Sequence, residues 1–316
     1  MSRHRRTRVA VVGGGQNGEH DVSLASAASV IAALDPGTYE VVSLTIGRDG
    51  AWRAGDDRVL DLAQALRILQ RCDVVFPVVH GPRGEDGALA ALCELAGLPY
   101  VGSSIRPGAI AMDKWATKLV AEAVGVATAA GVVLRRAEAA ALTWTGPVVV
   151  KPVAAGSSQG VSLVREPAQL APALEEALTY DDRVLVEEVL VGREIDVAVL
   201  RRADGSLVAS PPLEIVVDGL FDYERKYVGG ADFRVPAQLE EAEDKALREA
   251  ALRIFETLGC AGVARVDFFW TADGPVLNEV NTVPGMTEHS QVPRMFAAAG
   301  LPYADLLDDL VRGAYR

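Results

Sequence analysis

The sequence is poor in cysteine and in basic charge, and each shortage excludes a class of protein. Only three of its 316 residues are cysteines, and each stands alone among apolar residues, at Cys72, Cys93 and Cys260. This pattern is typical of buried, reduced thiols and indicates neither a disulfide framework nor a zinc site. Lys and Arg number 31 against 43 Asp and Glu, so the net charge is −12. An excess of acidic residues argues against a general nucleic-acid binder.

Long hydrophobic runs are also absent, because no apolar stretch approaches the roughly 20 residues that span a bilayer. The basic residues 1–8 lead into only four apolar residues before a run of three glycines, which is too short for a signal peptide. We therefore expect a cytoplasmic protein that binds no membrane. Half of the 316 residues are hydrophobic. The chain is long enough for two or three lobes, since single cores stop growing near roughly 250–300 residues.

Strands and helices alternate over the first hundred residues. Strands predicted at 8–12, 40–46 and 74–79 are separated by helices at 22–34 and 87–96. Alternation of this kind predicts a parallel sheet with right-handed crossovers. Further helices are expected near 109–124, 167–178 and 238–258, with two short helices at the end, and further strands at 147–151, 160–164, 183–189, 194–200 and 206–215. Residues 216–236 have no regular pattern, and an irregular stretch of this length is usually a lid.

A polar group interrupts two apolar runs near the C-terminus. The runs at 262–270 and 275–282 are joined by the turn residues 271–274, which predicts a β-hairpin. Side chains two apart share one face of a strand. The polar group consists of Arg265, Asp267, Glu279 and Asn281. Two carboxylates and an amide beside a cation suit Mg²⁺ shared with substrate phosphates. The alternative is a solvated hairpin face; we favour the metal site because the flanking residues are apolar.

A first glycine loop, residues 13–18, fits G-x-G-x-x-G between a strand and a helix, which is the dinucleotide fingerprint in its usual context. The acid expected at the end of the second strand is absent, and Arg48 stands there instead. An NADP-dependent oxidoreductase therefore stays open. Glu19 follows the glycines and would repel a pyrophosphate but attract an ammonium group, so we favour an amine. His80 ends the third strand, where open sheets bind ligands, as either a substrate contact or a helix-cap partner.

A second glycine loop, residues 155–160, follows Lys151. Its small residues allow backbone N–H groups to approach phosphate oxygens, and Ser157 and Ser158 add hydroxyl donors. A plain turn is the alternative, because Gly and Ser also favour turns. Together with Lys114, the loop and Lys151 predict a phosphate cradle.

Seven blocks in this order resemble the D-alanine–D-alanine ligase family of the ATP-grasp fold. They lie at residues 19–24, 80–87, 112–114, 150–158, 226–227, 265–267 and 278–290, and the similarity extends from residue 9 to about 305. The resemblance implies an α/β protein with the three-lobed ATP-grasp architecture. Its lobes are an N-terminal parallel α/β substrate-binding lobe at 1–105, a central α+β lobe at 106–185, and a C-terminal catalytic α+β lobe at 186–316 with a lid at 216–236.

The implied reaction uses ATP to phosphorylate the carboxylate of one D-alanine, which the amine of a second then attacks, giving a dipeptide for peptidoglycan. Two Mg²⁺ ions, with Mn²⁺ possible, and a homodimer are also implied. The ATP contacts would be Lys114, Lys151, Ser158, Glu187, Leu190, Glu194 and Lys226, and the metal ligands Asp267, Glu279 and Asn281. The catalytic residues would be Glu19, Ser157, Tyr227, Arg265, Gly285 and Ser290, with Val22 and His80 beside the first substrate.

Two positions depart from the family pattern. Gln291 stands where the family usually has a leucine that packs on the second alanine, and Glu188 replaces a lysine that helps to read adenine. Gln291 is accordingly expected to bind the second substrate. The departure raises the alternative of another second substrate, such as D-serine, or reflects a local shift of that loop. Tyr227, in contrast, favours an amine acceptor, since ligases of D-lactate have histidine at this lid position. A non-catalytic nucleotide sensor is disfavoured because the lysines, the metal ligands and Arg265 are all present.

Overall fold

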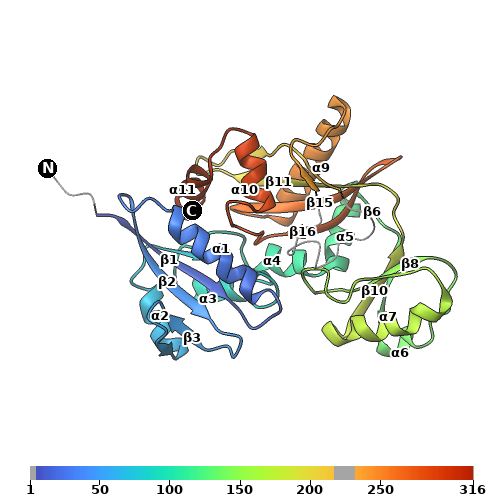
Figure 1. The fold of residues 1–316 in the computed structure, drawn as a ribbon, viewed down its shortest axis with the longest axis horizontal. Coiled ribbons are helices and arrows are strands. Elements are labelled where there is room, and N and C mark those ends of the chain that lie inside the picture. Colours follow the sequence, from blue (N-terminus) through green and yellow to red (C-terminus); the bar gives the residue numbers. More distant parts are fainter. Residues whose placement is uncertain (1–4, 217–231, 316) are drawn as a thin grey trace.

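The computed structural model describes residues 5–216 and 232–315, which form three sheets with helices packed on them. Figure 1 shows these parts side by side. The N-terminal sheet is blue, the hairpin of the large sheet (β15 and β16) is orange to red, and a smaller yellow-green sheet lies beside them. The site described below is built where these three parts meet.

The N-terminal sheet has the strand order β4-β3-β2-β1-β5. Its parallel part is formed by β1 (Thr7–Gly14), β2 (Tyr39–Ile46) and β5 (Val74–Pro77), with α1 (His20–Ala33) connecting β1 to β2 and α3 (Ala88–Leu95) following β5. These five predicted elements and the parallel pairing are confirmed. Three short elements were not predicted: β3 (Trp52–Ala54), β4 (Val59–Leu60) and α2 (Leu62–Leu69). The helix begins at a capping box of Asp61 and Gln64, a signal present in the sequence.

The central sheet is antiparallel, in the order β7-β10-β8-β9. Its strands are β7 (Gly131–Arg135), β10 (Arg183–Glu188), β8 (Val148–Pro152) and β9 (Ser162–Val164), and its helices are α6 (Arg136–Ala139) and α7 (Pro167–Tyr180). One apolar core joins the sheet to α7, with Val150, Val164 and Leu174 all buried. Three strands and the longer helix were predicted and are confirmed.

The large sheet has the order β14-β13-β11-β15-β16-β6, with β12 beside β11. Its strands are β11 (Arg193–Arg201), β12 (Leu207–Ala209), β13 (Leu213–Val216), β14 (Asp232–Arg234), β15 (Val263–Thr271), β16 (Gly274–Asn281) and β6 (Ala127–Thr128). The predicted hairpin of β15 and β16 is confirmed. The single strand predicted at 206–215 is wrong. It divides into β12 and β13 around Pro211 and Pro212, which have no N–H group to donate.

The helix predicted near 109–124 is also wrong as one element. It divides into α4 (Ile105–Met112) and α5 (Lys114–Ala123). The break lies at Asp113, whose carboxylate accepts a hydrogen bond from the Ala116 N–H at 2.9 Å and so caps α5. This cap fixes the direction of Lys114 at the first helical position.

Most of the predicted lid, including Lys226 and Tyr227, lies outside the described residues. Within the described part of 216–236, residues 232–234 form strand β14, which pairs with β13. The lobe boundaries near 105 and 185 stay a prediction. Strand β10 continues past 185 within the central sheet, and β6 joins the large sheet although it precedes residue 185.

One apolar core connects the N-terminal sheet to the large sheet. It contains residues of β1, α1, β5, β11, α10 (Gln291–Ala298) and α11 (Tyr303–Gly313), and α11 contacts both α1 and α10. On the other side of the large sheet, α9 (Glu241–Leu258) packs on β11 and β15. Because the core is continuous, the start of α1 is held at a fixed position relative to the end of β16.

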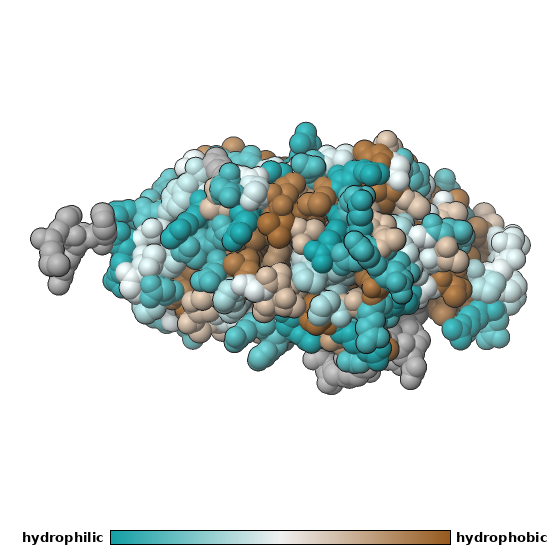
Figure 2. Space-filling model, turned by 90° about the horizontal axis from the view of Figure 1, so that it is seen from above, coloured by the Kyte–Doolittle hydropathy of each residue, from teal (hydrophilic) through white to brown (hydrophobic). Residues whose placement is uncertain are grey.

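The face of the molecule in Figure 2 is mainly hydrophilic, with hydrophobic residues gathered near its middle. Such a mixture is normal, since apolar atoms contribute much of the surface of any folded protein. Within the part of the chain that the structure describes, no helix has the length and hydrophobicity needed to cross a membrane.

Candidate active site

Two adjoining cavities lie where the three sheets meet. The larger, here called the interlobe cavity, lies between β8 and β10 of the central sheet and β11, β15 and β16 of the large sheet. The smaller, here called the inner pocket, is lined by Glu19, Val22, His80, Ser157 and Gly285. Arg265 lines both. The two cavities therefore share a guanidinium group at their junction.

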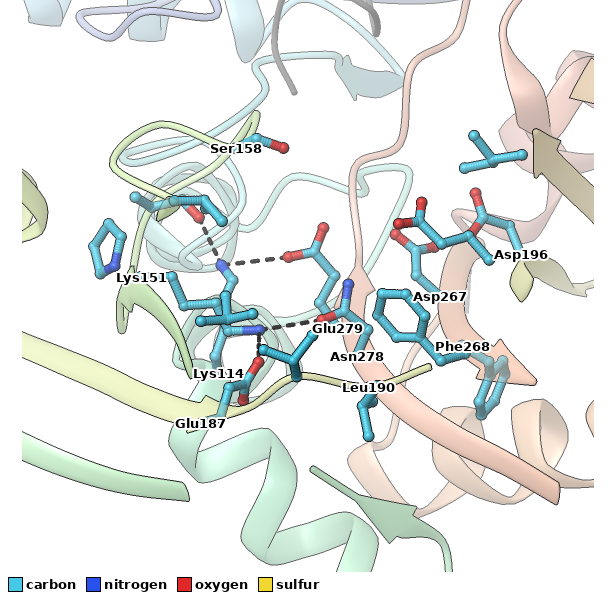
Figure 3. Close-up of a pocket in the computed structure, with 18 of the residues that line it drawn as sticks. Lys114, Lys151, Ser158, Glu187, Leu190, Asp196, Asp267, Phe268, Asn278 and Glu279 are labelled. Carbon is cyan, nitrogen blue, oxygen red and sulfur yellow. Dashed lines mark hydrogen bonds and ion pairs between the residues drawn. The ribbon is translucent and has the colours of Figure 1, made fainter. Parts of the chain in front are cut away.

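Two lysines from different elements point into the interlobe cavity. Lys114 Nζ lies 3.3 Å from Glu279 Oε2 and donates to the Ala155 carbonyl oxygen at 2.7 Å. Lys151 Nζ donates to Asn278 Oδ1 at 3.1 Å. Figure 3 shows both ammonium groups directed across the cavity toward Glu279 and Asn278 of β16. The lysines are 8% and 4% exposed, and buried ammonium groups require anionic or polar partners.

Glu187 balances two buried lysines at once. Its carboxylate lies 2.5 Å from Lys151 Nζ and 2.5 Å from Lys118 Nζ. Burial raises the pKa of Glu187, but the two ammonium groups outweigh burial, and the pKa lies below its ordinary value. Lys118 also donates to the Ala129 carbonyl oxygen at 2.8 Å, and burial lowers the pKa of Lys118 despite its contact with Glu187.

Lys118 was missed from the sequence, although a signal was present. It lies four residues after Lys114, on the same face of α5. Lys114, Lys151 and Arg265 line the cavity, and six carboxylates line it as well. Lys118 lies behind this lining, where it pairs with Glu187. The lysines can bind an anionic ligand, and the surplus of carboxylates suits a ligand that brings a divalent cation with it.

The polar group on β15 and β16 is buried and tightly bonded. Arg265 donates to both oxygens of Asp267, from Nε at 2.7 Å and from a terminal nitrogen at 2.6 Å. Asn281 Nδ2 donates to Asp267 Oδ2 at 3.0 Å. Arg265 and Asp267 are 5% and 7% exposed, so the alternative of a solvated hairpin face is wrong for them. Burial lowers the pKa of Arg265, but the carboxylates of Asp267 and Asp196 outweigh it and hold the pKa well above its ordinary value.

The donor set at this hairpin fits a divalent ion shared with phosphate. Asp267 and Glu279 are directly opposite each other across β15 and β16, as are Arg265 and Asn281. Within residues 5–216 and 232–315, no group of three or more His, Cys, Asp and Glu side chains is placed to hold a metal ion. Two carboxylates and one amide therefore form an incomplete ligand set. Phosphate oxygens complete such sets for Mg²⁺.

Glu19 in the inner pocket packs closely against Gly81 and Gly156. It accepts a hydrogen bond from the Ser157 hydroxyl, and a Cβ atom on Gly81 or Gly156 would overlap its Oε2. Ser157 and Ser158 have φ values of 52° and 56°, a left-handed conformation that costs energy in residues other than glycine. The second glycine loop is a turn between the antiparallel strands β8 and β9, as the plain-turn alternative expects, and its Ser157 also contacts Glu19.

His80 connects α1 to the segment that follows β16. Ser26 Oγ accepts from the Met286 N–H at 3.1 Å and lies 2.9 Å from His80 Nε2. A carbonyl oxygen can only accept, so His80 Nδ1 donates to the Val283 carbonyl oxygen at 2.7 Å. His80, which is 3% exposed, fixes the backbone on either side of Pro284 and Gly285 against the inner pocket.

The remaining predicted residues divide between these cavities. Ser158, Leu190 and Glu194 line the interlobe cavity. Ser290 lies next to Gly285, but its hydroxyl accepts from the Thr287 N–H at 3.1 Å. Glu188 is exposed, and its carboxylate accepts from the Ala130 N–H at 2.8 Å.

The first glycine loop serves close packing. A Cβ atom on Gly13 would lie 2.6 Å from Ala27 Cβ, and Gly14 has a φ of +86°. Arg48 pairs with Asp21 at 2.9 Å, and both side chains are largely exposed. These residues bring α1 close to β1 and place Glu19 in the inner pocket. They do not form the ribose site that a dinucleotide would need.

Comparison with known proteins gives one consistent result. A family model described as "D-ala D-ala ligase N-terminus" matches residues 8–103, and one described as "D-ala D-ala ligase C-terminus" matches residues 121–312. The D-alanine–D-alanine ligase of Rhodococcus jostii is 41% identical, over 97% of this chain and 96% of the relative.

Two solved structures extend the comparison. The VanG D-Ala:D-Ser ligase from Enterococcus faecalis has a TM-score of 0.87 and 33% identity, covering 98% of this chain and 100% of its own. The D-alanine–D-alanine ligase from Bacillus anthracis, solved in complex with ATP, has a TM-score of 0.80 and 26% identity, with coverage of 98% and 97%. The predicted three-lobed ATP-grasp architecture is confirmed by these similarities.

Proposed function

Because the chain belongs to the D-alanine–D-alanine ligase family, we propose that it uses ATP to join two D-alanines into the dipeptide required for peptidoglycan. The observation that carries the proposal is the position of Arg265 at the junction of two cavities. One cavity offers buried lysines and the other a buried carboxylate. A nucleotide in the first and an amino acid in the second would meet at this arginine.

The interlobe cavity takes the nucleotide. Lys114 and Lys151 bind its phosphates, and Ser158 donates from the glycine loop. Phosphate oxygens then replace Glu279 and Asn278 as the partners of these ammonium groups. Glu187 and Leu190 lie toward the adenosine end, and Glu194 accepts from the ribose hydroxyls. Lys226 is assigned to ATP by resemblance alone, since it lies outside the described residues.

Asp267, Glu279 and Asn281 would hold the Mg²⁺ ions, or Mn²⁺ in their place, which neutralise phosphate charge during phosphoryl transfer. Within the chain itself, Arg265 holds the Asp267 carboxylate in one orientation through two hydrogen bonds. Lys114 contacts Glu279 from the opposite wall, with Nζ 3.3 Å from Oε2.

The inner pocket takes the first D-alanine. Glu19 accepts from its ammonium group, Ser157 keeps the Glu19 carboxylate in place, and Val22 and His80 lie beside the substrate. The D-alanine carboxylate oxygen attacks the γ-phosphorus and ADP leaves, which gives an acyl phosphate. The amine of the second D-alanine attacks the acyl carbon, and inorganic phosphate leaves as the peptide bond forms.

The oxyanion that forms in the second step lies beside Arg265 and the backbone N–H of Gly285. His80 fixes the segment that contains Gly285, so this donor is preorganised before the reaction. Each such donor typically contributes about 3–4 kcal/mol to the stability of the transition state. Ser290 receives the carboxylate of the second substrate, which requires its hydroxyl to turn away from Thr287.

D-Alanine is the favoured second substrate. The relative at 41% identity is named a D-alanine–D-alanine ligase, whereas the D-serine ligase is at 33%. The NADP-dependent oxidoreductase alternative is not favoured, because the first glycine loop packs α1 on β1. The nucleotide-sensor alternative leaves the inner pocket without a role.

The test is ADP release by the purified protein with Mg²⁺ and ATP, with and without D-alanine. Release that requires D-alanine, matched by one D-alanyl-D-alanine per ADP in a mass spectrum, is the expected result. Release at the same rate without D-alanine, or no release in either case, would refute the proposal. A second amino acid can be exchanged for D-serine in the same assay to check the acceptor.

Two further features belong to the same proposal and come from the family resemblance alone. They are a homodimeric state and a cytoplasmic location. Sedimentation equilibrium tests the first, with a mass near twice the 33.4 kDa of the chain as the expected value. Fractionation of cells tests the second.

A further inference from the structure

Gln291 is buried, and both ends of its amide are occupied. The side chain lies at the first position of α10 and is 9% exposed. Its Oε1 accepts from a terminal nitrogen of Arg265 at 2.7 Å, and its Nε2 donates to Asp196 Oδ2 at 2.7 Å. The residue that departs from the family pattern is thus engaged within the protein and does not line the inner pocket.

Asp196 is the second member of this arrangement. It lies on β11 directly across from Asp267 on β15, is 2% exposed, and its Oδ2 is 3.3 Å from Arg265 Nε. Asp196 was not among the residues expected from the sequence. It contacts the arginine and the glutamine at once and closes a ring of three side chains.

The chemistry of the ring fixes the orientation of the amide. A carboxylate can only accept and a guanidinium can only donate. Gln291 must therefore turn Nε2 to Asp196 and Oε1 to Arg265, since the opposite orientation would face donor with donor and acceptor with acceptor. Asp196 in this way aims the Gln291 oxygen at the arginine. Asp267 holds the other edge of the guanidinium, so the group is fixed on two sides.

We propose that Gln291, oriented by Asp196, is a positioning residue that holds the Arg265 guanidinium at the junction of the two cavities, and that it does not select the second substrate. The inference rests on the proposed function, in which Arg265 stabilises the oxyanion. A displacement of about 1 Å in such a group can cost roughly a hundredfold in rate. Gln291 accordingly acts on kcat, and the choice between D-alanine and D-serine is made elsewhere.

The test exchanges the amide of Gln291 and the carboxylate of Asp196, the two groups that share the hydrogen bond. Gln291→Glu places a carboxylate against Asp196 and is expected to lower kcat by about tenfold to a hundredfold, with little change in KM for ATP. Asp196→Asn retains an acceptor for Gln291 and is expected to lower kcat less than about fivefold. The double variant restores both the net charge and a donor–acceptor pair, because the amide introduced at position 196 donates to the carboxylate introduced at position 291.

The decisive result is the recovery of kcat in the double variant. We expect kcat of the double variant to return to within about threefold of Asp196→Asn, which a general loss of packing would not produce. Gln70→Glu, a change of the same kind at an exposed position, is the control for added charge. Melting temperatures identify any variant that is misfolded, and the double variant then remains the informative one, because its ring is again complete.

The acceptor preference gives an independent readout. Gln291→Leu, which removes both hydrogen bonds, is expected to lower kcat with either acceptor and to leave the D-serine to D-alanine ratio of kcat/KM unchanged. A changed ratio at unchanged kcat, or a double variant no faster than Gln291→Glu, would overturn the inference. The two failures can be distinguished, because the proposed function is tested on the unaltered protein, by D-alanine-dependent ADP release and dipeptide formation, and the inference is tested by comparing the variants.

Discussion

Replacement of Glu187 by glutamine tests the charge balance of the interlobe cavity. The change preserves shape and removes the one negative charge that lies 2.5 Å from both Lys118 and Lys151. The two lysines would retain only neutral partners, the Ala129 carbonyl oxygen and Asn278 Oδ1. Lys118, at 1% exposure, cannot be hydrated in compensation, whereas Lys151 lines the interlobe cavity.

The loss of one partner from a buried ion pair typically costs about 3–5 kcal/mol. For a chain of 316 residues, this corresponds to a fall in melting temperature of roughly 5–8 °C, from an unfolding entropy of about 2.1 cal/mol/K per residue. Differential scanning calorimetry without nucleotide measures it. Glu188→Gln is the matched control, because Glu188 is exposed and accepts from one backbone N–H, and we expect it to shift the melting temperature by less than about 1 °C.

The same variant has a defined pH dependence. The pKa of Glu187 lies below its ordinary value of 4.5, so the stability that its charge contributes is present above pH 4.5 and is lost as the pH falls toward the lower value. The difference in stability between the unaltered protein and Glu187→Gln should therefore shrink below pH 4.5. Equal melting temperatures for Glu187→Gln and Glu188→Gln would refute this account.

Three further predictions follow from other contacts. Gly156→Ala should lower kcat/KM for D-alanine by at least about tenfold, because its Cβ would overlap Glu19. Gly146→Ala is the control and should leave the kinetics unaltered, because a Cβ at that position meets open space. Equal activity of the two variants would contradict the placement of Glu19. Glu279→Gln should raise the Mg²⁺ concentration needed for half-maximal activity by about tenfold or more in a titration at fixed ATP; an unchanged midpoint would remove Glu279 from the metal ligands. Burial raises the pKa of all three cysteine thiols, to about 12 for two of them. A maleimide reagent at neutral pH should therefore modify the folded protein far more slowly than the urea-unfolded chain. Rapid modification of the folded protein would show that the thiols are accessible. The thiols are Cys72, Cys93 and Cys260.

Local patterns explain why much of the fold could be predicted. Alternation of strand and helix specified the parallel N-terminal sheet, and the turn at 271–274 specified the hairpin of β15 and β16. On that hairpin, strand periodicity was sufficient to place Arg265 with Asp267. The predicted helix at 109–124 and the predicted strand at 206–215 were each wrong as single elements. Each is interrupted by a local signal, the helix cap at Asp113 and the two prolines before β13, and such signals do not alter the hydrophobic periodicity.

The candidate site was less predictable, because its contacts join distant parts of the chain. His80 bonds to a carbonyl oxygen 203 residues away, and Ser157 to a carboxylate 138 residues away. A sequence shows which side chains can donate or accept, but only packing selects their partners. Lys118 illustrates the difference, since its spacing from Lys114 was visible and its contact with Glu187 was not.

From the sequence alone, the resemblance carried by seven blocks implied the family and the three-lobed architecture. Residue identity and strand periodicity determined the chemical types at the site. The tertiary structure decided how the groups are paired. In the folded protein, Glu187 pairs with two lysines. Gln291, which was expected to contact the second substrate, instead forms hydrogen bonds with Asp196 and Arg265. The physical reason is that a buried charge must find a partner wherever the folded chain supplies one, and that partner is set by the packing of distant strands.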